Sequence, residues 1–588
     1  MCGVFGYVGQ RRDVGAAIVA ALKTLEYRGY DSWGLAVATA DGLLVDKDVG
    51  RINGQVRVFP EATIGLGHTR WATHGRVTRQ NAHPHTDCHR RIAVVHNGII
   101  ENHAVLKDQL LQRGHQFRSE TDSEVVAHLV EEQLAAHRPL AESVALVFRL
   151  LEGHNAIVVM DAVSGKLAAA KRTTPLIIGQ GGQGSTIASD AFALQGHADR
   201  LIHLEDGQLA VLAANSANIL DRATLLPSQP VSVAVAVDRD DAGLGSYPDF
   251  LTKEVAEQPT VLRRLVASSG DDVEGLSTEM RRANRVILTG CGSAGNAALA
   301  GAYMLNSVCA MESSFVPASE FSHRAGRRLA GSLVIALSQS GETLDVLEAM
   351  DEARRRGARL AAVVNAPNSS LERRVDARVM LGAGVEQCVL ATKSYSAMIA
   401  ALMLTAFDLA GKFAAGAAAV CGAAQAIEAL LEPDARGHIG EIGSRLAARD
   451  HLFVIGRGVH YPSALEAALK IKEVSYIHAE GFAAGELKHG VIALVEPGTP
   501  CLVFAPDDET RTDMVSSASE LRSRGGHIIG VGSTPDPVFD EFIPTLPVGI
   551  ASPIVEAIPG QLLGYGAALA RGHDPDRPRN LAKSVTVK

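Results

Sequence analysis

The sequence predicts an α/β protein, with a layered αββα domain at the N-terminus followed by two tandem doubly wound parallel-sheet domains. Three observations support this prediction. The first 237 residues mix short β-rich runs with Gly- and His-rich loops. The later residues alternate between a strand, a glycine turn and an Ala/Leu-rich helix. This second pattern occurs twice along the chain. A chain of 588 residues has room for three or four domains, at about 100–200 residues each.

The N-terminal region contains β-rich runs at residues 92–95, 156–160 and 231–237. Such runs, separated by polar and glycine-rich loops, are typical of layered sheets with helices packed outside them. A polar, glycine-containing stretch then begins at residue 238, and such stretches commonly separate domains. We therefore expect a first domain at residues 1–237 and a linker at 238–250.

The second half of the chain contains an internal repeat. A strand at 286–290 with a glycine turn leads into a helix at 296–305, and the same arrangement recurs about 166 residues later at 452–456 and 463–474. Two further strands of each copy match at nearly the same offset: 333–338 with 502–505, and 361–364 with 528–531. Unrelated α/β units also resemble one another, but three matched elements at a nearly constant offset favour duplication.

The repeat predicts two parallel-sheet domains with right-handed crossovers. We place them at residues 251–425 and 426–570, with a C-terminal tail at 571–588.

Composition narrows the possible partners and cellular location. The formal net charge is −9, which argues against a general nucleic-acid or anionic-membrane binder. The seven cysteines are scattered without CxxC or Cys/His zinc spacing, so we expect a reduced cytoplasmic chain with no metal. We find no signal peptide, and the most apolar segment, at 397–410, is interrupted by Thr405 and Asp408. That segment is better explained as a buried helix than as a membrane span.

Cys2 follows the initiator methionine directly. If Met1 is removed, this residue carries both a nucleophilic thiol and a free α-amine that can act as its general base. The α-amine titrates near pH ~7.7–8, so much of it is neutral in the cytosol. A cysteine at position 2 also occurs by chance, and the case for catalysis depends on its surroundings.

The two copies of the repeat differ at the turn after the second matched strand. The first copy has Ser338-Gln339-Ser340-Gly341-Glu342-Thr343, whereas the second has Asp507 and Asp508 at this place. Hydroxyls and backbone N–H groups at a helix start favour phosphate, and two carboxylates repel it. One phosphate site per chain is expected, in the first copy, although a Ser-rich turn alone is often only a helix cap.

Four polar segments accompany Cys2: residues 26–32, 68–75, 96–98 and 119–122. Together they resemble the glutamine amidotransferases with an N-terminal cysteine nucleophile. The resemblance implies that Cys2 attacks the side-chain amide of L-glutamine, with Asn97 and the Gly98 N–H as oxyanion hole. Arg70 and Asp122 would bind the α-carboxylate and α-ammonium groups, and Trp71, Thr73 and His83 would complete the glutamine pocket. The histidines at 68, 74, 83, 85 and 89 are interpreted as packing groups, since the family uses no metal.

The second half resembles the sugar isomerase (SIS) domain family in tandem. The most specific segments are Leu337–Thr343, 469–473, 484–490 and the tail 578–587. With the amidotransferase in front, the whole chain is similar to the isomerising glutamine:fructose-6-phosphate aminotransferases. That resemblance implies glutamine and fructose 6-phosphate as substrates, glucosamine 6-phosphate as product, no cofactor and a homodimer.

The same resemblance implies roles for individual residues. Glu473 would move a proton between C1 and C2, Lys470 would lie one helical turn away on the same face, and Lys583 would form a Schiff base at C2. His489 would open the sugar ring from the partner subunit. The sugar phosphate would be bound by Ser293, Ser338, Gln339, Ser340, Thr343 and Val389. Arg28 and Trp71 would seal and gate an internal ammonia channel.

Four positions depart from the family pattern: Trp33, Ala294, Ala391 and Val491. The two alanines each lose a serine hydroxyl expected to face the sugar, and one lost hydrogen bond costs about 0.5–1.5 kcal/mol. Two alternatives therefore stay open beside the aminotransferase: a paralogue that aminates another ketose phosphate, and a non-catalytic sugar-phosphate-binding regulator.

Overall fold

The computed structural model describes residues 2–52, 57–235 and 243–585. By their contacts the residues form two compact units, Met1–Arg239 with Ala582–Lys588, and Asp240–Leu581. Part of the expected linker, residues 238–242, lies outside the described residues, as does Met1.

Within the described residues, the first unit contains an eight-stranded and a six-stranded antiparallel sheet. The larger sheet has the order β14-β11-β9-β10-β1-β4-β2-β3, and the smaller has the order β13-β12-β8-β7-β6-β5. The strands of the larger sheet are β1 (Gly3–Gly9), β2 (Ser32–Thr39), β3 (Gly42–Val49), β4 (Ile64–Arg70), β9 (Ile177–Gly181), β10 (Gly184–Ala188), β11 (Arg200–His203) and β14 (Ser232–Ala234). Those of the smaller are β5 (His85–Thr86), β6 (Ile92–Gly98), β7 (Asn155–Asp161), β8 (Lys166–Arg172), β12 (Gln208–Ala213) and β13 (Ser216–Asp221).

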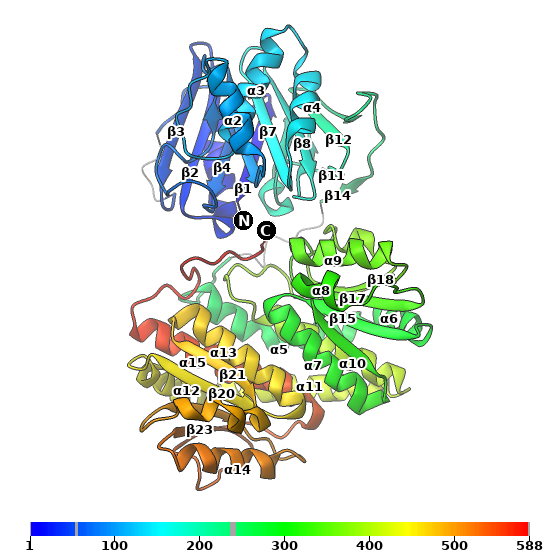
Figure 1. The fold of residues 1–588 in the computed structure, drawn as a ribbon, viewed down its shortest axis with the longest axis vertical. Helices are drawn as coiled ribbons and strands as arrows, with labels where there is room; N and C mark the ends of the chain where they lie inside the picture. Colours follow the sequence, from blue (N-terminus) through cyan, green and yellow to red (C-terminus); the bar gives the residue numbers. More distant parts are fainter. Residues whose placement is uncertain (1, 53–56, 236–242, 586–588) are drawn as a thin grey trace. The chain divides into compact units, whose positions relative to one another are not determined.

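The layers follow from the alternation of side chains along the strands. On β1, Val4 and Val8 face a core shared by both sheets, while Phe5 and Tyr7 face α1 (Val14–Leu25), as the two-residue period of a strand requires. The smaller sheet is covered on its other face by α3 (Glu124–Ala135) and α4 (Leu140–Leu150), with α2 (His103–Gln112) beside α3 (Figure 1). The predicted αββα arrangement is confirmed.

Over its described part, the second unit contains two five-stranded parallel sheets with the same topology. The orders are β16-β15-β17-β18-β19 and β21-β20-β22-β23-β24, which in chain order is 2-1-3-4-5 in each copy. The first sheet consists of β15 (Arg285–Gly290), β16 (Ser313–Pro317), β17 (Ser332–Ser338), β18 (Arg359–Val364) and β19 (Ala377–Met380), and the second of β20 (His451–Gly456), β21 (His478–Ala483), β22 (Pro500–Phe504), β23 (His527–Gly532) and β24 (Glu541–Pro544). The predicted tandem parallel sheets are confirmed.

Helices cover these two sheets and join them. They are α5 (Phe250–Ser268), α6 (Gly270–Arg281), α7 (Gly292–Cys309), α8 (Phe321–Arg324), α9 (Leu344–Arg355), α10 (Lys393–Leu409), α11 (Phe413–Leu431), α12 (Pro433–Leu446), α13 (Tyr461–Ser475), α14 (Arg511–Arg522) and α15 (Ser552–Ala570). One continuous apolar core includes residues of both sheets and of α7, α10, α13 and α15. Helices α7 and α13, each following the first strand of its copy, pack against one another.

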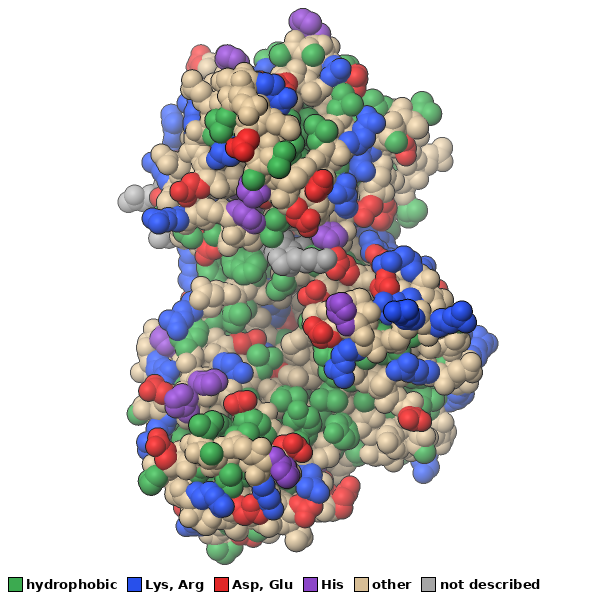
Figure 2. Space-filling model, in the orientation of Figure 1, with side chains coloured by type: hydrophobic (Ala, Val, Ile, Leu, Met, Phe, Trp, Pro, Cys, Tyr) green, Lys and Arg blue, Asp and Glu red, His purple; other side chains and the backbone are tan. Residues whose placement is uncertain are grey.

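The apolar segment at 397–410 lies mostly in α10, where its side chains are buried. Among the described residues one helix, α11, is long and apolar enough to cross a membrane by length and composition. Its buried face, which includes Val420, Ala424 and Ile427, packs into the core of the second unit. Acidic and basic side chains are both present over the face drawn in Figure 2.

Candidate active sites

Cys2 lies beside the end of β4 because β1, which begins at the next residue, pairs with that strand. Gly3 is opposite Thr69 in the register, so the thiol reaches the first residues after β4. The Cys2 Sγ accepts a hydrogen bond from the Trp71 backbone N–H at 3.2 Å. Burial raises the pKa of the Cys2 thiol, while the Trp71 N–H and the Arg70 guanidinium oppose that rise. A base is therefore needed to form the nucleophilic thiolate.

Asn97 lies near the end of β6 and contacts the nucleophile's own backbone. Its Nδ2 donates to the Cys2 carbonyl at 3.0 Å, and its Oδ1 lies 3.0 Å from His68 Nε2. Burial lowers the pKa of His68 to about 3, and because the same Nε2 lies 3.2 Å from the His96 carbonyl oxygen, that nitrogen must be the donor. Asn97 is thus oriented with its NH₂ group toward Cys2.

Gly98 follows with a backbone conformation open only to glycine. Its φ is +127°, and a Cβ there would meet the His154 carbonyl oxygen at 2.1 Å. The glycine allows the chain to pass this carbonyl while its N–H stays next to Asn97, as an oxyanion site requires.

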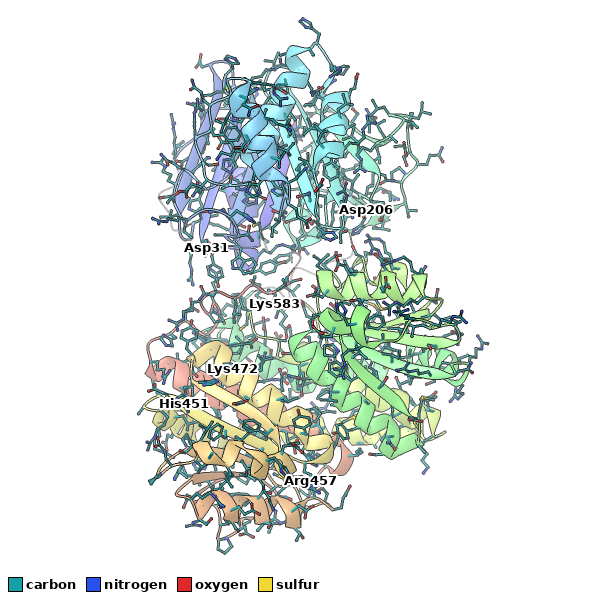
Figure 3. All side chains as sticks on the ribbon, viewed as in Figure 1. Asp31, Asp206, His451, Arg457, Lys472 and Lys583 are labelled. Atoms are coloured by element: carbon teal, nitrogen blue, oxygen red, sulfur yellow. The ribbon has the colours of Figure 1, made fainter. Side chains whose placement is uncertain are left out.

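Arg70 and Asp122 are buried and held by backbone groups. The Arg70 guanidinium donates to the carbonyls of residues 74, 75 and 76, and burial lowers its pKa against the opposing effect of nearby carboxylates. Asp122 accepts from the Ile100 N–H at 2.8 Å and from the Ser123 hydroxyl at 3.1 Å. The loop that follows Arg70 is also anchored, because Asp31 (Figure 3) accepts from the Ala72 N–H at 2.8 Å.

A pocket brings all the predicted glutamine-site residues together. Its lining includes Cys2, Arg70, Trp71, Thr73, His83, Asn97, Gly98 and Asp122. Sequence reasoning missed His74, His96, Thr121 and Ser123, which line the same pocket. The adjacency of His96 to Asn97 was the available signal: its ring bonds Ser123 and Asn155, both at 2.8 Å, and so fixes the strand end. The assigned roles of these residues stay predictions.

Arg28, predicted to seal an ammonia channel, is engaged within the first unit. Its guanidinium is 2.5 Å from Asp190, and the Tyr27 hydroxyl donates to the same carboxylate at 2.7 Å. Trp33, one of the departures from the family pattern, is buried in the core behind β2 and does not line the pocket.

The predicted phosphate loop joins β17 to α9. Ser338 ends the strand, and its Oγ accepts from the Gly341 N–H at 2.9 Å, while Ser340 Oγ accepts from the Glu342 N–H at 3.2 Å. Gly341 has φ +64° and a Cβ there would lie 2.2 Å from Ser369 Oγ. Gln339 and Thr343 are half-buried, and Thr343 directly precedes the start of α9. The loop has the geometry of an anion site at a helix start.

The corresponding loop of the second copy is occupied by an internal ion pair. Asp508 lies 2.7 Å from Nε2 of the buried His460, whose Nδ1 is 2.7 Å from Glu556. Burial favours the neutral imidazole, but the two carboxylates raise the pKa of His460 to about 10. Of the two carboxylates expected to exclude phosphate from this copy, Asp508 therefore holds a charged histidine, and Asp507 accepts hydrogen bonds from the hydroxyls of Ser533 and Thr534.

Lys470 and Glu473 meet on α13, as their spacing predicts. The Lys470 ammonium is 2.6 Å from Glu473 and 3.5 Å from Glu466. Lys470 and Glu466 are buried, whereas a fifth of the Glu473 side chain is exposed. Burial alone would lower the pKa of Lys470, but the two carboxylates raise it above its usual value, so Lys470 is a cation beside an accessible carboxylate.

Glu466 is a site residue that sequence reasoning missed. Asn296 of α7 donates to it at 2.8 Å, and the Ser293 hydroxyl also hydrogen-bonds it. Ser293, predicted to contact phosphate, is thus engaged with a carboxylate of α13. The Glu466–Lys470–Glu473 spacing of four and three residues was the available signal, because it places all three on one helical face.

The remaining predicted residues lie in separate segments. Val389 is buried, with its N–H donating to the Asp576 carbonyl at 3.0 Å. His489 ends a short helix, η7 (Ala484–His489), and is exposed. Lys583 (Figure 3) is half-buried in the final segment, which groups with the first unit. Their roles at a sugar stay predictions.

Comparisons with known proteins identify both halves. A glutamine amidotransferase domain model matches residues 68–196, and the SIS domain model matches 279–407 and 445–569. The isomerizing glutamine–fructose-6-phosphate aminotransferase of Pyrococcus horikoshii is 39% identical over 600 residues, and one from Thermus thermophilus is 40% identical over 622, each covering 100% of both chains.

A solved structure, the C-terminal domain of glucosamine-fructose-6-phosphate aminotransferase from Francisella tularensis, covers 57% of this chain and 100% of its own, with a TM-score of 0.54 and 30% identity. Together with identity of this order over the entire length of its relatives, the match shows that the chain belongs to the isomerizing glutamine–fructose-6-phosphate aminotransferase family.

Proposed function

We propose that this protein hydrolyses glutamine at Cys2, transfers the ammonia to fructose 6-phosphate and isomerises the product to glucosamine 6-phosphate. The observation that best supports this is the presence of two different sites on one chain: a cysteine pocket in the first unit, and in the second a buried lysine, Lys470, paired with the accessible carboxylate of Glu473. The full-length relatives are named for the same two substrates.

In the glutaminase half, the Cys2 thiolate attacks the amide carbon of glutamine. The α-amine exposed by loss of Met1 accepts the thiol proton and then passes it to the leaving nitrogen. Asn97 Nδ2 and the Gly98 N–H stabilise the oxyanion of the tetrahedral intermediate. Collapse of the tetrahedral intermediate breaks the C–N bond and releases ammonia. The thioester left on Cys2 is then hydrolysed by water to glutamate. Arg70 and Asp122 would bind the two charged groups at the other end of glutamine.

In the sugar half, the Ser338–Thr343 loop would bind the 6-phosphate through its N–H groups and hydroxyls. Ammonia would attack C2 and displace the amine of Lys583 from a Schiff base whose formation had released the C2 oxygen as water. Glu473 would then take a proton from C1 of the resulting imine and deliver one to C2, which converts the ketose into the amino aldose. The ammonium of Lys470, 2.6 Å from Glu473, would hold this carboxylate in position. Lys583 would engage the C2 carbonyl as a Schiff base, and His489 would open the ring.

Ammonia must pass between the sites without becoming ammonium, so we propose a closed channel gated by Trp71 and sealed by Arg28. The ion pair of Arg28 with Asp190 holds the arginine side chain in one place, as a seal requires. We further propose a cytoplasmic homodimer in which each subunit supplies its exposed His489 to the partner's sugar site.

The test is a coupled assay with glutamine and fructose 6-phosphate, in which glutamate and glucosamine 6-phosphate are quantified together. Near-equal yields are expected. Cys2→Ala should abolish both products, whereas Glu473→Gln should abolish amino sugar while glutamate release continues. Glutamate without amino sugar in the wild-type protein would refute the assignment of the acceptor.

Ala294 and Ala391 provide the reason to extend this assay to other ketose phosphates. Ala294 packs against the core of the second unit, and Ala391 is half-buried just before α10. Amination of another ketose phosphate in preference to fructose 6-phosphate would favour the paralogue. Sugar-phosphate binding with neither product formed would favour the regulator.

A further inference from the structure

A second cluster of reactive side chains lies in the first unit, outside the glutamine pocket. It consists of Cys88, His115, His128 and Glu131, whose ligand atoms all lie within 4.8 Å of one another. Cys88 is on the loop between β5 and β6, His115 follows α2, and the other two are one turn apart on α3. Because 43 positions separate the first from the last, no local sequence motif identifies them.

The separations within the cluster are those of a tetrahedral metal site. Cys88 Sγ is 3.6 Å from Nδ1 of His115 and 3.6 Å from Nδ1 of His128. Glu131 Oε2 is 3.1 Å and 3.3 Å from the same two nitrogens. With Zn–S near 2.3 Å and Zn–N and Zn–O near 2.0–2.1 Å, a tetrahedron has edges of about 3.6 Å between S and N and about 3.4 Å between N and O.

The outward-facing nitrogens of both imidazoles have carboxylates next to them. His115 Nε2 is 3.2 Å from Glu132 Oε1, and His128 Nε2 is 3.7 Å from Glu124 Oε1. The hydrogen bond to Glu132 favours the His115 tautomer whose inner nitrogen is unprotonated and able to bind metal. At 3.7 Å, His128 Nε2 lies beyond hydrogen-bonding distance of Glu124. The Gln116 backbone also hydrogen-bonds the Cys88 sulfur.

We propose that Cys88, His115, His128 and Glu131 form a structural Zn²⁺ site. A thiolate and a carboxylate together balance the charge of the ion, so the occupied site is neutral and can remain largely shielded from solvent. Binding displaces the thiol proton to solvent and forms bonds from Zn²⁺ to Sγ, the two Nδ1 atoms and Oε2. Thiolate with imidazole favours zinc over magnesium or calcium.

The site would tie together three segments that otherwise meet only through side-chain contacts. One of them, α3, begins two residues after Asp122 of the glutamine pocket. The ion would therefore fix the start of α3, and its removal should loosen this part of the first unit without removing any group from the glutamine pocket.

The experiment uses the full-length protein stripped of metal with a chelator and titrated with Zn²⁺ against a chromophoric competitor. We expect one Zn²⁺ per chain with a dissociation constant below about 1 μM. Cys88→Ser should weaken binding by more than about 100-fold, and Glu132→Gln, behind His115, by about 10–100-fold. Co²⁺ in place of Zn²⁺ should give a thiolate-to-cobalt charge-transfer band that Cys88→Ser removes.

Two cysteine variants act as controls. Cys2→Ala removes the other thiol of this unit that lies near histidines, and Cys421→Ser removes a half-buried thiol of α11. Both should keep the zinc stoichiometry and the cobalt band. A wild-type protein without the band, or a Cys88→Ser protein that binds Zn²⁺ as tightly as wild type, would overturn the proposal. If Cys88→Ser does not fold, the wild-type band and the two controls decide the question.

Discussion

Replacing Asn97 with alanine tests the arrangement of the glutamine pocket most directly. The change removes the Nδ2 donor, which lies 3.0 Å from the Cys2 carbonyl and next to the Gly98 N–H. Loss of one oxyanion donor costs about 100–1,000-fold in kcat, or about 2.7–4 kcal/mol. Since the donor acts on charge that develops during reaction, the loss should appear in kcat rather than in KM for glutamine.

The cost to folding should be much smaller. Asn97 makes one hydrogen bond to Cys2 and one with His68, each contributing about 0.5–1.5 kcal/mol. His68 Nε2 keeps the His96 carbonyl at 3.2 Å, so its buried N–H is not left without an acceptor. We expect a loss of about 1–2 kcal/mol in the free energy of unfolding.

The assay is glutamate release under saturating glutamine, with urea unfolding of the same preparations. Asn218→Ala, on the exposed side of β13, is the matched control and should leave both kcat and stability unchanged. A folded Asn97→Ala protein with kcat within about threefold of wild type would refute the oxyanion assignment. Loss of kcat in proportion to loss of folded protein would refute it equally.

Three further predictions concern the second unit. Lys470→Met should destabilise the protein by about 3–5 kcal/mol in urea unfolding, because it leaves the carboxylate of Glu473 and its neighbour without a buried cation; unchanged stability would contradict the burial argument. Ala391→Ser should lower KM for fructose 6-phosphate by up to about tenfold without altering glutaminase activity, and an unchanged KM would remove this position from the sugar site. The raised pKa of His460, about 10, should contribute stability that is complete below the unfolded value near 6.5 and is lost as pH rises through 10. Unfolding of wild type and His460→Gln at pH 7 and pH 10 should therefore show a smaller difference at the higher pH, and an equal difference would show that Asp508 does not hold a charged ring.

The sequence predicted those features that depend on local pattern and repetition. Strand β6 and three strands of each parallel sheet (β15, β17 and β18, and β20, β22 and β23) were predicted to within a few residues, because their apolar runs are bounded by glycine turns. The outer strands β16, β19, β21 and β24 were not predicted. The glutamine pocket was also predictable, since Cys2 and Arg70 lie at the ends of the paired strands β1 and β4, and Asn97 lies near the end of β6, which packs against them from the other sheet. Here the motifs and the topology place the same residues in one site.

The features that sequence reasoning missed depend on contacts between distant elements. Glu466 is separated by 170 positions from Asn296, and only the packing of α7 on α13 reveals why a carboxylate is buried there. Likewise, the four residues of the Cys88 cluster come from a loop, a helix end and α3. The spacing of cysteine and histidine along the chain does not reveal this cluster, because the fold and not a continuous motif brings the four residues together.

Duplication explains why the groups of the proposed sugar site are divided between the two copies. Helices α7 and α13 are equivalent, since each follows the first strand of its sheet, and they pack against one another. In the first copy the later loop keeps Ser338 and its neighbours for an anion, while in the second copy Asp508 holds His460. Conversely, α13 has the Glu466–Lys470–Glu473 row, and α7 supplies only hydrogen bonds to it from Ser293 and Asn296. The buried carboxylate of Glu466 accepts hydrogen bonds from the amide and hydroxyl groups that α7 presents, which a second copy of the α13 row would not supply, so the divergence of the two copies matches the needs of this interface.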